Sequence, residues 1–159
     1  MKTQRLFVLA LIFVLVLAIT IPMAAAAGDS EVPFKATYQG VPVGIYDPEC
    51  NCLHQTYEFD GVATHLGESH LSATGQTILV PPFPVSGSGT LIAGNGDLLY
   101  WKYEGFGVFL PSGDVTYSGS FSITGGTGRF VGVNGAGTYS GSATPGVWGI
   151  IKLDGKLIK

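Results

Sequence analysis

The residues with the clearest chemical potential are two cysteines, Cys50 and Cys52, separated by one asparagine. Asp47, Glu49 and His54 lie within three residues of them. A local disulfide is one state open to this cluster, and it requires a turn, because two cysteines one residue apart in a straight strand lie near or beyond bonding distance. Free or intermolecular thiols are a second state. A soft-metal or redox site with His54 is a third, although the sequence lacks a four-ligand zinc pattern.

Histidines are the side chains best suited to acid–base work near neutral pH. His65 is an even number of positions from the apolar residues Tyr57 and Phe59, so in a continuous strand its side chain would lie on their face. It therefore either projects into an apolar interior or is a hydrogen-bonded structural residue. His70 and Glu68 lie near a predicted turn, where a solvated role is expected. The sequence offers no convincing acid–base partner for any of these histidines.

The remaining charged candidates are two carboxylates and one arginine. Glu58 and Asp60 lie on a hydroxyl-rich face, where exposed carboxylates keep ordinary acidity and are poor proton shuttles. Arg129 directly follows a glycine turn. Its guanidinium either ties down carbonyls or a carboxylate at the rim of the fold or clamps an anionic ligand. These patterns predict no catalytic residue, no metal and no cofactor.

Aromatic side chains on predicted apolar faces carry the remaining binding potential, because rings with polar tips are well suited to hold small apolar ligands. These side chains are Tyr57, Trp101, Tyr103, Tyr117 and Tyr139. We therefore expect the ligand-binding set to be Tyr57, His65, Trp101, Tyr117, Arg129 and Tyr139.

The elements that must position these residues are β-strands. Between Val115 and Thr124, apolar residues and glycine alternate strictly with serine and threonine, which predicts a strand with one buried face. The same alternation runs from Thr56 to Thr64 and from Thr138 to Thr144. Further strands are expected at Val32–Tyr38, Ser69–Val80, Gly87–Ala93, Asp97–Tyr103, Arg129–Val133 and Val147–Leu157.

Glycine-containing turns join these strands. Asn95-Gly96 predicts a two-residue type I′ hairpin that pairs Leu91-Ile92 with Leu98-Leu99. Gly67-Glu68 is expected to reverse the chain before the strand at 69–80. Roughly eight strands with mostly short connections favour an antiparallel meander closed into a barrel, which removes exposed edges. A two-sheet β-sandwich is the alternative, because alternation alone does not distinguish closure from stacking.

Residues 1–27 have the features of a signal peptide. Lys2 and Arg5 precede an uncharged apolar run, and alanines at 24–27 supply the small residues that a signal peptidase needs. We expect cleavage at these alanines and a secreted protein. The alternative is an uncleaved membrane anchor, because the apolar run is long enough to span a bilayer. Export to an oxidising compartment favours the disulfide among the three cysteine states.

Residues 28–159 fit a single domain. All 24 glycines lie there, and its eleven acidic residues outnumber six basic ones, for a net charge of about −5. Such a surface lacks the basic stripe from which nucleic-acid binding draws its affinity. We therefore expect no nucleic-acid partner, and contact with a membrane only through an uncleaved signal segment.

Two glycine-rich stretches resemble a known family. They are residues 61–67, GVATHLG, and residues 125–137, GGTGRFVGVNGAG. Together they resemble small secreted bacterial proteins of the allene oxide cyclase barrel-like group, and the second is similar to the GGTGKF-type turn of plant dirigent proteins. The resemblance implies an eight-stranded antiparallel barrel, often homo-oligomeric, with an apolar small molecule in its lumen. It transfers no catalytic residue, since the acidic residues of those families have no matching positions here.

Two functions follow from this reading. The favoured one is a secreted barrel that binds a small apolar or amphipathic molecule, or a protein partner, without converting it. Its rival is a cofactor-free isomerase or cyclase of the allene oxide cyclase or dirigent type, in which a lumen enforces the conformation of a substrate. The favoured function predicts a cavity of at least a few hundred cubic ångströms. The rival predicts a buried ionisable group beside an apolar cavity.

Overall fold

A computed structural model describes residues 30–159; the predicted signal segment at 1–27 lies outside them. The described chain is all-β. In chain order its elements are β1 (Glu31–Gly40), β2 (Val43–Asp47), β3 (Cys52–Ala63), β4 (Gly67–Ile78), β5 (Pro84–Ala93), β6 (Leu98–Phe109), β7 (Val115–Gly126), the 3-10 turn η1 (Gly128–Phe130), β8 (Asn134–Thr144) and β9 (Trp148–Ile158). None of the helices within this part of the chain is long and apolar enough to cross a membrane.

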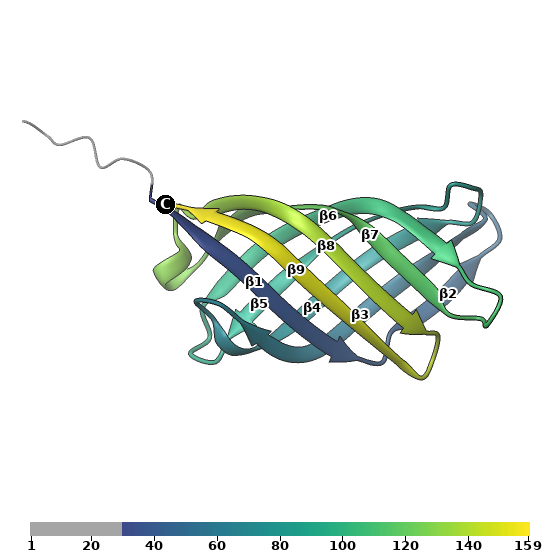
Figure 1. Ribbon diagram of the computed structural model, residues 1–159, viewed down its shortest axis with the longest axis horizontal. Coiled ribbons are helices and arrows are strands. Elements are labelled where there is room, and N and C mark those ends of the chain that lie inside the picture. The colour runs from purple at the N-terminus through teal and green to yellow at the C-terminus, as the bar shows by residue number, and fades with distance from the viewer. Residues whose placement is uncertain (1–29) are drawn as a thin grey trace, which may run out of the picture.

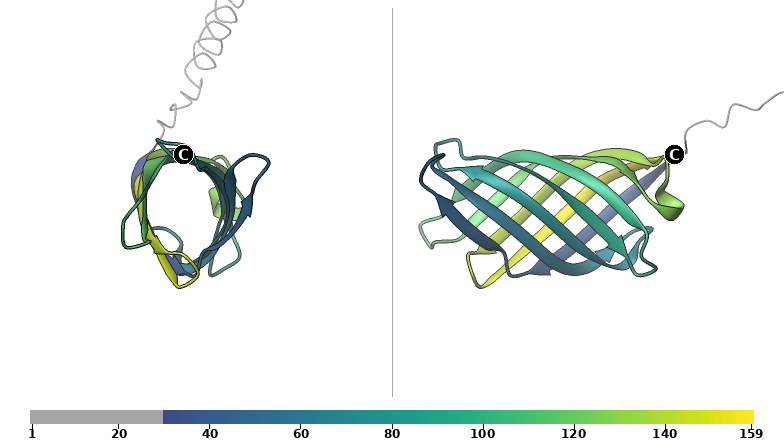
Figure 2. Two further views of the ribbon diagram at one scale, coloured as in Figure 1. Left: turned by 90° about the vertical axis from the view of Figure 1, so that its right-hand side faces the viewer. Right: turned by 180° about the vertical axis from the view of Figure 1, so that it is seen from behind.

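The strands form a closed barrel (Figures 1 and 2). β3 to β9 pair antiparallel with their neighbours in chain order, and β1 pairs with β9 along its length. Closure comes from β1 and β3, which pair from Ala36 opposite Ala63 to Gln39 opposite Asp60. The predicted eight-stranded antiparallel barrel is confirmed, and the β-sandwich alternative is wrong.

The structure has one strand more than the predicted eight, and this additional strand, β2, was not predicted. Among residues 30–159 it pairs only with the first half of β3, from Val43 opposite Thr56 to Asp47 opposite Cys52, and its other edge has no partner strand there. Figure 2 shows β2 and its turn standing away from the ring of the other strands when the barrel is viewed along its axis. Val43 and Ile45 on one face and Tyr46 on the other are all exposed, so β2 lacks the alternation of burial by which the other strands are recognised in the sequence.

The core fills the barrel and follows the predicted faces. Tyr57, Phe59 and Ala63 on β3 are buried, as are Phe121 and Ile123 on β7. Large inward rings need small residues opposite them. A side chain at either Gly75 or Gly87 would overlap the hydroxyl end of Tyr103, so glycine on β4 and β5 makes room for this ring.

Two predicted connections differ in detail. Leu91 pairs with Leu99 as expected, but only Gly96 of the Asn95-Gly96 pair has a positive φ. The connection is a three-residue hairpin loop that ends with a glycine in the left-handed backbone conformation. The prediction of a type I′ turn is therefore wrong. The segment predicted as a strand at Arg129–Val133 is instead the 3-10 turn η1 followed by a turn, because backbone hydrogen bonds join residues three apart.

Candidate ligand-binding site

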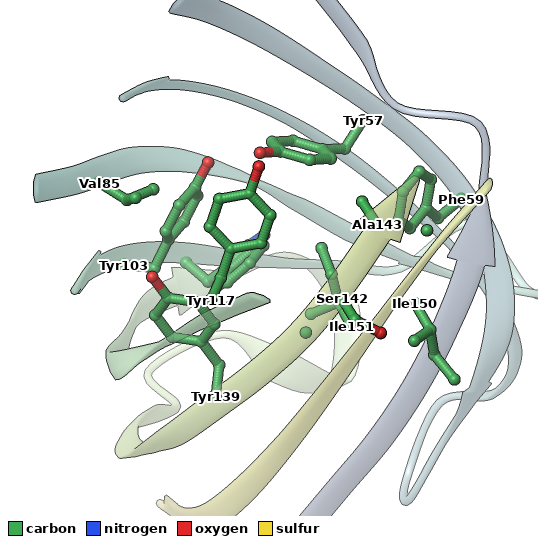
Figure 3. A pocket seen from close by; sticks show the side chains of 13 residues that line it. Tyr57, Phe59, Val85, Tyr103, Tyr117, Tyr139, Ser142, Ala143, Ile150 and Ile151 are labelled. Atoms are coloured by element: carbon green, nitrogen blue, oxygen red, sulfur yellow. The ribbon is translucent and has the colours of Figure 1, made fainter. Parts of the chain in front are cut away.

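Four tyrosines from four strands converge inside the barrel (Figure 3). Tyr57 comes from β3, Tyr103 from β6, Tyr117 from β7 and Tyr139 from β8. The rings of Tyr103 and Tyr139 meet edge to face at 5.5 Å between centroids. Trp101 stacks on Tyr103 at 4.8 Å. Four of the six predicted ligand-binding residues are therefore brought together in the lumen.

Burial is the main influence on the pKa values of these four tyrosines, and it raises all of them. It raises the pKa of Tyr57 and Tyr103, and neighbouring tyrosines raise both further. It also raises the pKa of Tyr139 to about 12. For Tyr117, burial raises the pKa and a hydrogen bond from Gln55 opposes this increase. All four hydroxyls therefore stay protonated near neutral pH and are unsuited to act as bases.

The space left among these rings is small. Between the tyrosines and the wall formed by Gly141, Ala143 and Gly149 lies a cavity of about 20 Å³, which holds no more than a single water molecule. The expected cavity of a few hundred cubic ångströms is therefore not found at this depth of the lumen. The rings pack against one another and fill the space.

A larger cavity lies next to the layer of tyrosine rings, toward the end of the barrel where β2 separates from the ring of the other strands. We call it the mouth cavity; it has a volume of about 440 Å³, within the usual range of ligand sites. Val43 and Gly44 of β2 form one wall and Val115 and Ala143 form the opposite side. Tyr117 lines both this cavity and the small one below, so the tyrosine layer is the floor of the mouth.

A chain of hydrogen bonds fixes the floor of the mouth cavity. The Thr77 hydroxyl donates to the side-chain oxygen of Gln55 over 2.8 Å, and the Gln55 amide donates to the Tyr117 hydroxyl over 3.1 Å. Thr77 is fully buried and Gln55 nearly so. The Tyr117 hydroxyl accepts one bond and retains its own proton for donation to a bound molecule.

Sequence reasoning missed Gln55 and Thr77 as site residues. Gln55 lies two residues before Tyr57 and four before Phe59, and therefore on the same inward face of β3. A polar residue within an inward apolar row was the available signal, because buried polar groups require partners. The mouth cavity itself had no signal in the sequence, since it depends on where β2 separates from the barrel.

The rim around the mouth cavity is unusually apolar. Side chains at this end that are exposed despite being large and apolar include Val41, Val43, Phe109, Leu110, Val147 and Trp148. They come from the β1–β2, β6–β7 and β8–β9 connections or the strand ends beside them. Apolar exposure of this kind is typical of sites that bind apolar molecules or partners.

The other two predicted site residues lie at the opposite end of the barrel. His65 does not project into the lumen; it is exposed in the β3–β4 turn with a φ of 68°, and its Nε2 donates to the carbonyl oxygen of Pro33 over 3.0 Å. The turn therefore comes earlier than the predicted Gly67-Glu68 reversal, and it breaks the strand phase that predicted an inward histidine. Arg129 lies at this rim, with its Nε 3.6 Å from Asp97 and its guanidinium over the ring of Phe130.

His70 has partners that the sequence did not reveal. Its Nδ1 lies 2.8 Å from Asp60 and its Nε2 lies 2.7 Å from Glu58, on the outer wall of the barrel. The hydrogen bonds that the His70 ring donates to these two carboxylates raise the pKa of His70. Because both ring nitrogens are occupied as donors, the arrangement stabilises an imidazolium and leaves no free nitrogen to act as a base.

The two cysteines lie close together at the end of the β2–β3 hairpin. Their Cα atoms are 5.2 Å apart and their sulfur atoms are at bonding distance. The turn required for such a pair is present, with Asn51 between them at a φ of 50°. The local pairing expected from the sequence is therefore the arrangement found, and within the described residues neither cysteine is free.

Comparison with known proteins provides no relative: no family model, no curated protein and no solved structure matches this chain. The function is therefore inferred from the geometry of the barrel.

Proposed function

We propose that this protein binds one small, neutral, amphipathic molecule in the mouth cavity and does not convert it chemically. The observation that carries this proposal is a cavity of about 440 Å³ whose walls are apolar and whose floor offers a positioned hydroxyl. Concave apolar sites with a few placed polar groups are typical of small-molecule binding. The signal-like segment at 1–27 further supports binding after export.

The chemistry of the lining defines the class of ligand. Among the described residues that line the mouth cavity, Gln55 and Tyr117 carry the polar side-chain groups and none of the side chains is charged. A charged ligand would lose its hydration without gaining a counter-charge, at a high cost in free energy. A neutral molecule with an apolar body and a carbonyl or ether oxygen would accept a hydrogen bond from Tyr117 and cover the apolar walls.

A binding function fits the site better than the cyclase-type alternative. That alternative needs a buried group able to give or take a proton near neutral pH. Tyr117 is the one titratable side chain among the described residues of the mouth cavity, and burial raises its pKa further from neutrality. It is suited to donating a hydrogen bond to a ligand rather than to proton transfer.

The proposal is tested by titrating the purified protein with a neutral naphthyl ketone dye whose emission shifts to the blue in apolar surroundings. We expect saturable one-to-one binding. Gly44→Phe should fill the mouth cavity: Gly44 lines this cavity and is paired with the inward-facing Gln55, and a Cβ there meets no atom within 4 Å, so the backbone can accept a side chain. This variant should weaken binding by at least about tenfold.

The matched control is Ile45→Phe on the next residue of β2. Ile45 is paired with the exposed His54, so its side chain points away from the mouth cavity, and this variant should bind the dye normally. Tyr117→Phe removes the donor to the ketone and should weaken binding about two- to tenfold, the usual range for one hydrogen bond. Equal binding by the Gly44 and Ile45 variants would show that the dye does not occupy the mouth cavity and would refute the proposal.

A further inference from the structure

A second site lies outside the barrel, at the end of the β2–β3 hairpin. Asp47, Cys50, Cys52 and His54 place four potential metal ligands there, with one carboxylate oxygen, two sulfurs and one ring nitrogen all within 4.8 Å of one another. We propose that this cluster binds one Zn²⁺ ion when the Cys50–Cys52 pair is reduced, and releases it when the pair is oxidised.

The register of the hairpin explains why these side chains meet. Asp47 lies directly opposite Cys52 in the β2–β3 ladder. Cys52 and His54 are two residues apart on the same strand and therefore share a face. Cys50 lies in the turn that joins the strands, so its side chain can return over this face. The backbone thus holds the four ligands without help from any distant segment.

The distances match those in a tetrahedral zinc site. Zn–N and Zn–O bonds of about 2.0–2.2 Å and Zn–S bonds of about 2.3 Å place ligand nitrogen and oxygen about 3.3–3.5 Å apart, and nitrogen and sulfur about 3.6 Å apart. Here the Nε2 of His54 lies 3.3 Å from the Oδ2 of Asp47. The same nitrogen lies 3.6 Å from the Sγ of Cys52. Three of the four ligands are therefore already spaced for the ion.

Reduction is needed to supply the remaining chemistry. In the disulfide, the sulfurs are bonded to each other and neither is a thiolate, the form of cysteine that binds metals. Two electrons and two protons, delivered by a dithiol donor that itself becomes a disulfide, break the S–S bond and leave two thiols. Zn²⁺ then displaces the two thiol protons and forms two Zn–S bonds. In the reverse step, a disulfide oxidant accepts the two electrons, takes up two protons from solvent and becomes a dithiol, while the Cys50–Cys52 S–S bond forms again and the ion is released.

A neighbouring side chain supports the thiolate form. The amide of Gln76, on β4, lies opposite His54 in the ladder and donates to the Sγ of Cys52 over 2.8 Å. A donor aimed at sulfur stabilises negative charge on it and is typical of the shell around metal-binding cysteines. Cys52 is fully buried, whereas Cys50 and His54 are exposed, so an ion can enter from the Cys50 side.

The barrel does not depend on this disulfide. The Cys50–Cys52 bond closes a loop with a single intervening residue, and such a short loop restricts the unfolded chain little. Neither cysteine belongs to the hydrophobic core cluster that fills the barrel. Reduction should therefore leave a folded protein with two free thiols.

The test is a Zn²⁺ titration of the protein, oxidised and reduced, against a colour-changing zinc indicator. A phosphine is used as the reductant, because a dithiol would compete for the ion. The reduced protein should bind one equivalent of Zn²⁺ at least about a hundredfold more tightly than the oxidised protein. Co²⁺ in place of Zn²⁺ should give the visible bands of a tetrahedral thiolate site.

Variants identify the ligands. The Cys50→Ser/Cys52→Ser double variant should lose Zn²⁺ binding under reducing conditions, and His54→Gln should weaken it at least about tenfold. Glu49→Gln is the matched control, since this exposed carboxylate lies beside the cluster but is not one of its ligands. Equal binding by oxidised and reduced protein, no binding by reduced protein, unchanged binding by His54→Gln, or loss of the strand circular dichroism on reduction would each overturn the proposal.

Discussion

The Gln55 amide donates to the Tyr117 hydroxyl across the lumen, joining β3 to β7 through residues that are 62 positions apart in the chain. Thr77 on β4 completes this chain through the other end of the Gln55 amide. Three strands are thus linked by polar groups inside an otherwise apolar barrel. This linkage sets the floor of the mouth cavity and fixes the direction in which Tyr117 presents its hydroxyl.

Replacing Gln55 tests this linkage. Gln55→Leu leaves the fully buried Thr77 hydroxyl without its partner, and we expect the free energy of unfolding to fall by about 1–3 kcal/mol. Chemical denaturation followed by tryptophan fluorescence measures the change. The double variant Gln55→Leu/Thr77→Val should recover part of this loss, because it also removes the buried Thr77 hydroxyl that lost its partner; a double variant less stable than Gln55→Leu would argue against the linkage.

Two tyrosine-to-phenylalanine changes should have opposite effects on stability. Within the described residues the buried Tyr139 hydroxyl has no hydrogen-bond partner, so Tyr139→Phe should raise the free energy of unfolding by about 1 kcal/mol. Tyr38→Phe removes the hydroxyl that lies 2.9 Å from the Ser69 hydroxyl, and it should lower stability by about 1 kcal/mol. Urea denaturation of both variants checks the signs, and the same sign for both would contradict the assigned hydrogen bonding.

The His70 cluster predicts a pH-dependent contribution to stability. Asp60 and Glu58 raise the pKa of His70 above its ordinary value of 6.5, so the stabilisation is fully present below pH 6.5 and is lost as the pH rises through the folded-state pKa. His70 and Ser72 lower the pKa of Glu58 below 4.5, so its contribution is present above pH 4.5 and is lost on acidification. Both contributions are therefore present between these values.

Solvent exposure limits the size of this effect to at most about 1 kcal/mol. His70→Gln should remove the loss of stability that accompanies a rise in pH above 6.5, as measured by urea denaturation across a pH series. High salt should reduce the effect in the wild-type protein. A His70→Gln protein with the same pH profile as the wild type would show that this cluster does not contribute.

The pairing of β1 with β3, which closes the barrel, predicts a position that does not tolerate a side chain. Gly61 lies opposite Tyr38 where β1 meets β3, and a Cβ there would collide with the backbone of Thr37 and Tyr38. Gly61→Ala should lower the free energy of unfolding by about 1–3 kcal/mol. Gly44→Ala is the matched control, because a Cβ at Gly44 meets no atom within 4 Å. Equal stability of the two variants would contradict closure by β1 and β3.

Much of the barrel could be predicted from sequence because inward and outward side chains alternate. The phase of Tyr117, Phe121 and Ile123 on β7 defines the buried face of that strand without knowledge of its neighbours. Short connections between successive strands then favour the observed order. The close approach of Cys50 and Cys52 was also accessible from the sequence, because only a turn between them was required.

The features that could not be predicted depend on register or on exposure. His70 meets Asp60 because the turn at residues 64–66 sets the β3–β4 register, and moving the turn by one residue would change every cross-strand pair. β2 has apolar residues exposed on both faces, which resembles a loop in sequence. The mouth cavity follows from the departure of β2 from the ring, so neither its position nor its size was visible in the pattern of residues.

The central claim is that the mouth cavity holds a neutral amphipathic molecule. It is tested most directly by recording backbone amide nuclear magnetic resonance spectra of isotope-labelled protein during titration with the naphthyl ketone. The largest shifts should fall on Gly44, Val115, Tyr117 and Ala143, which line the cavity. Shifts that instead concentrate at the opposite end, around Val133 and Leu157, or spectra that do not change at saturating ligand, would contradict it.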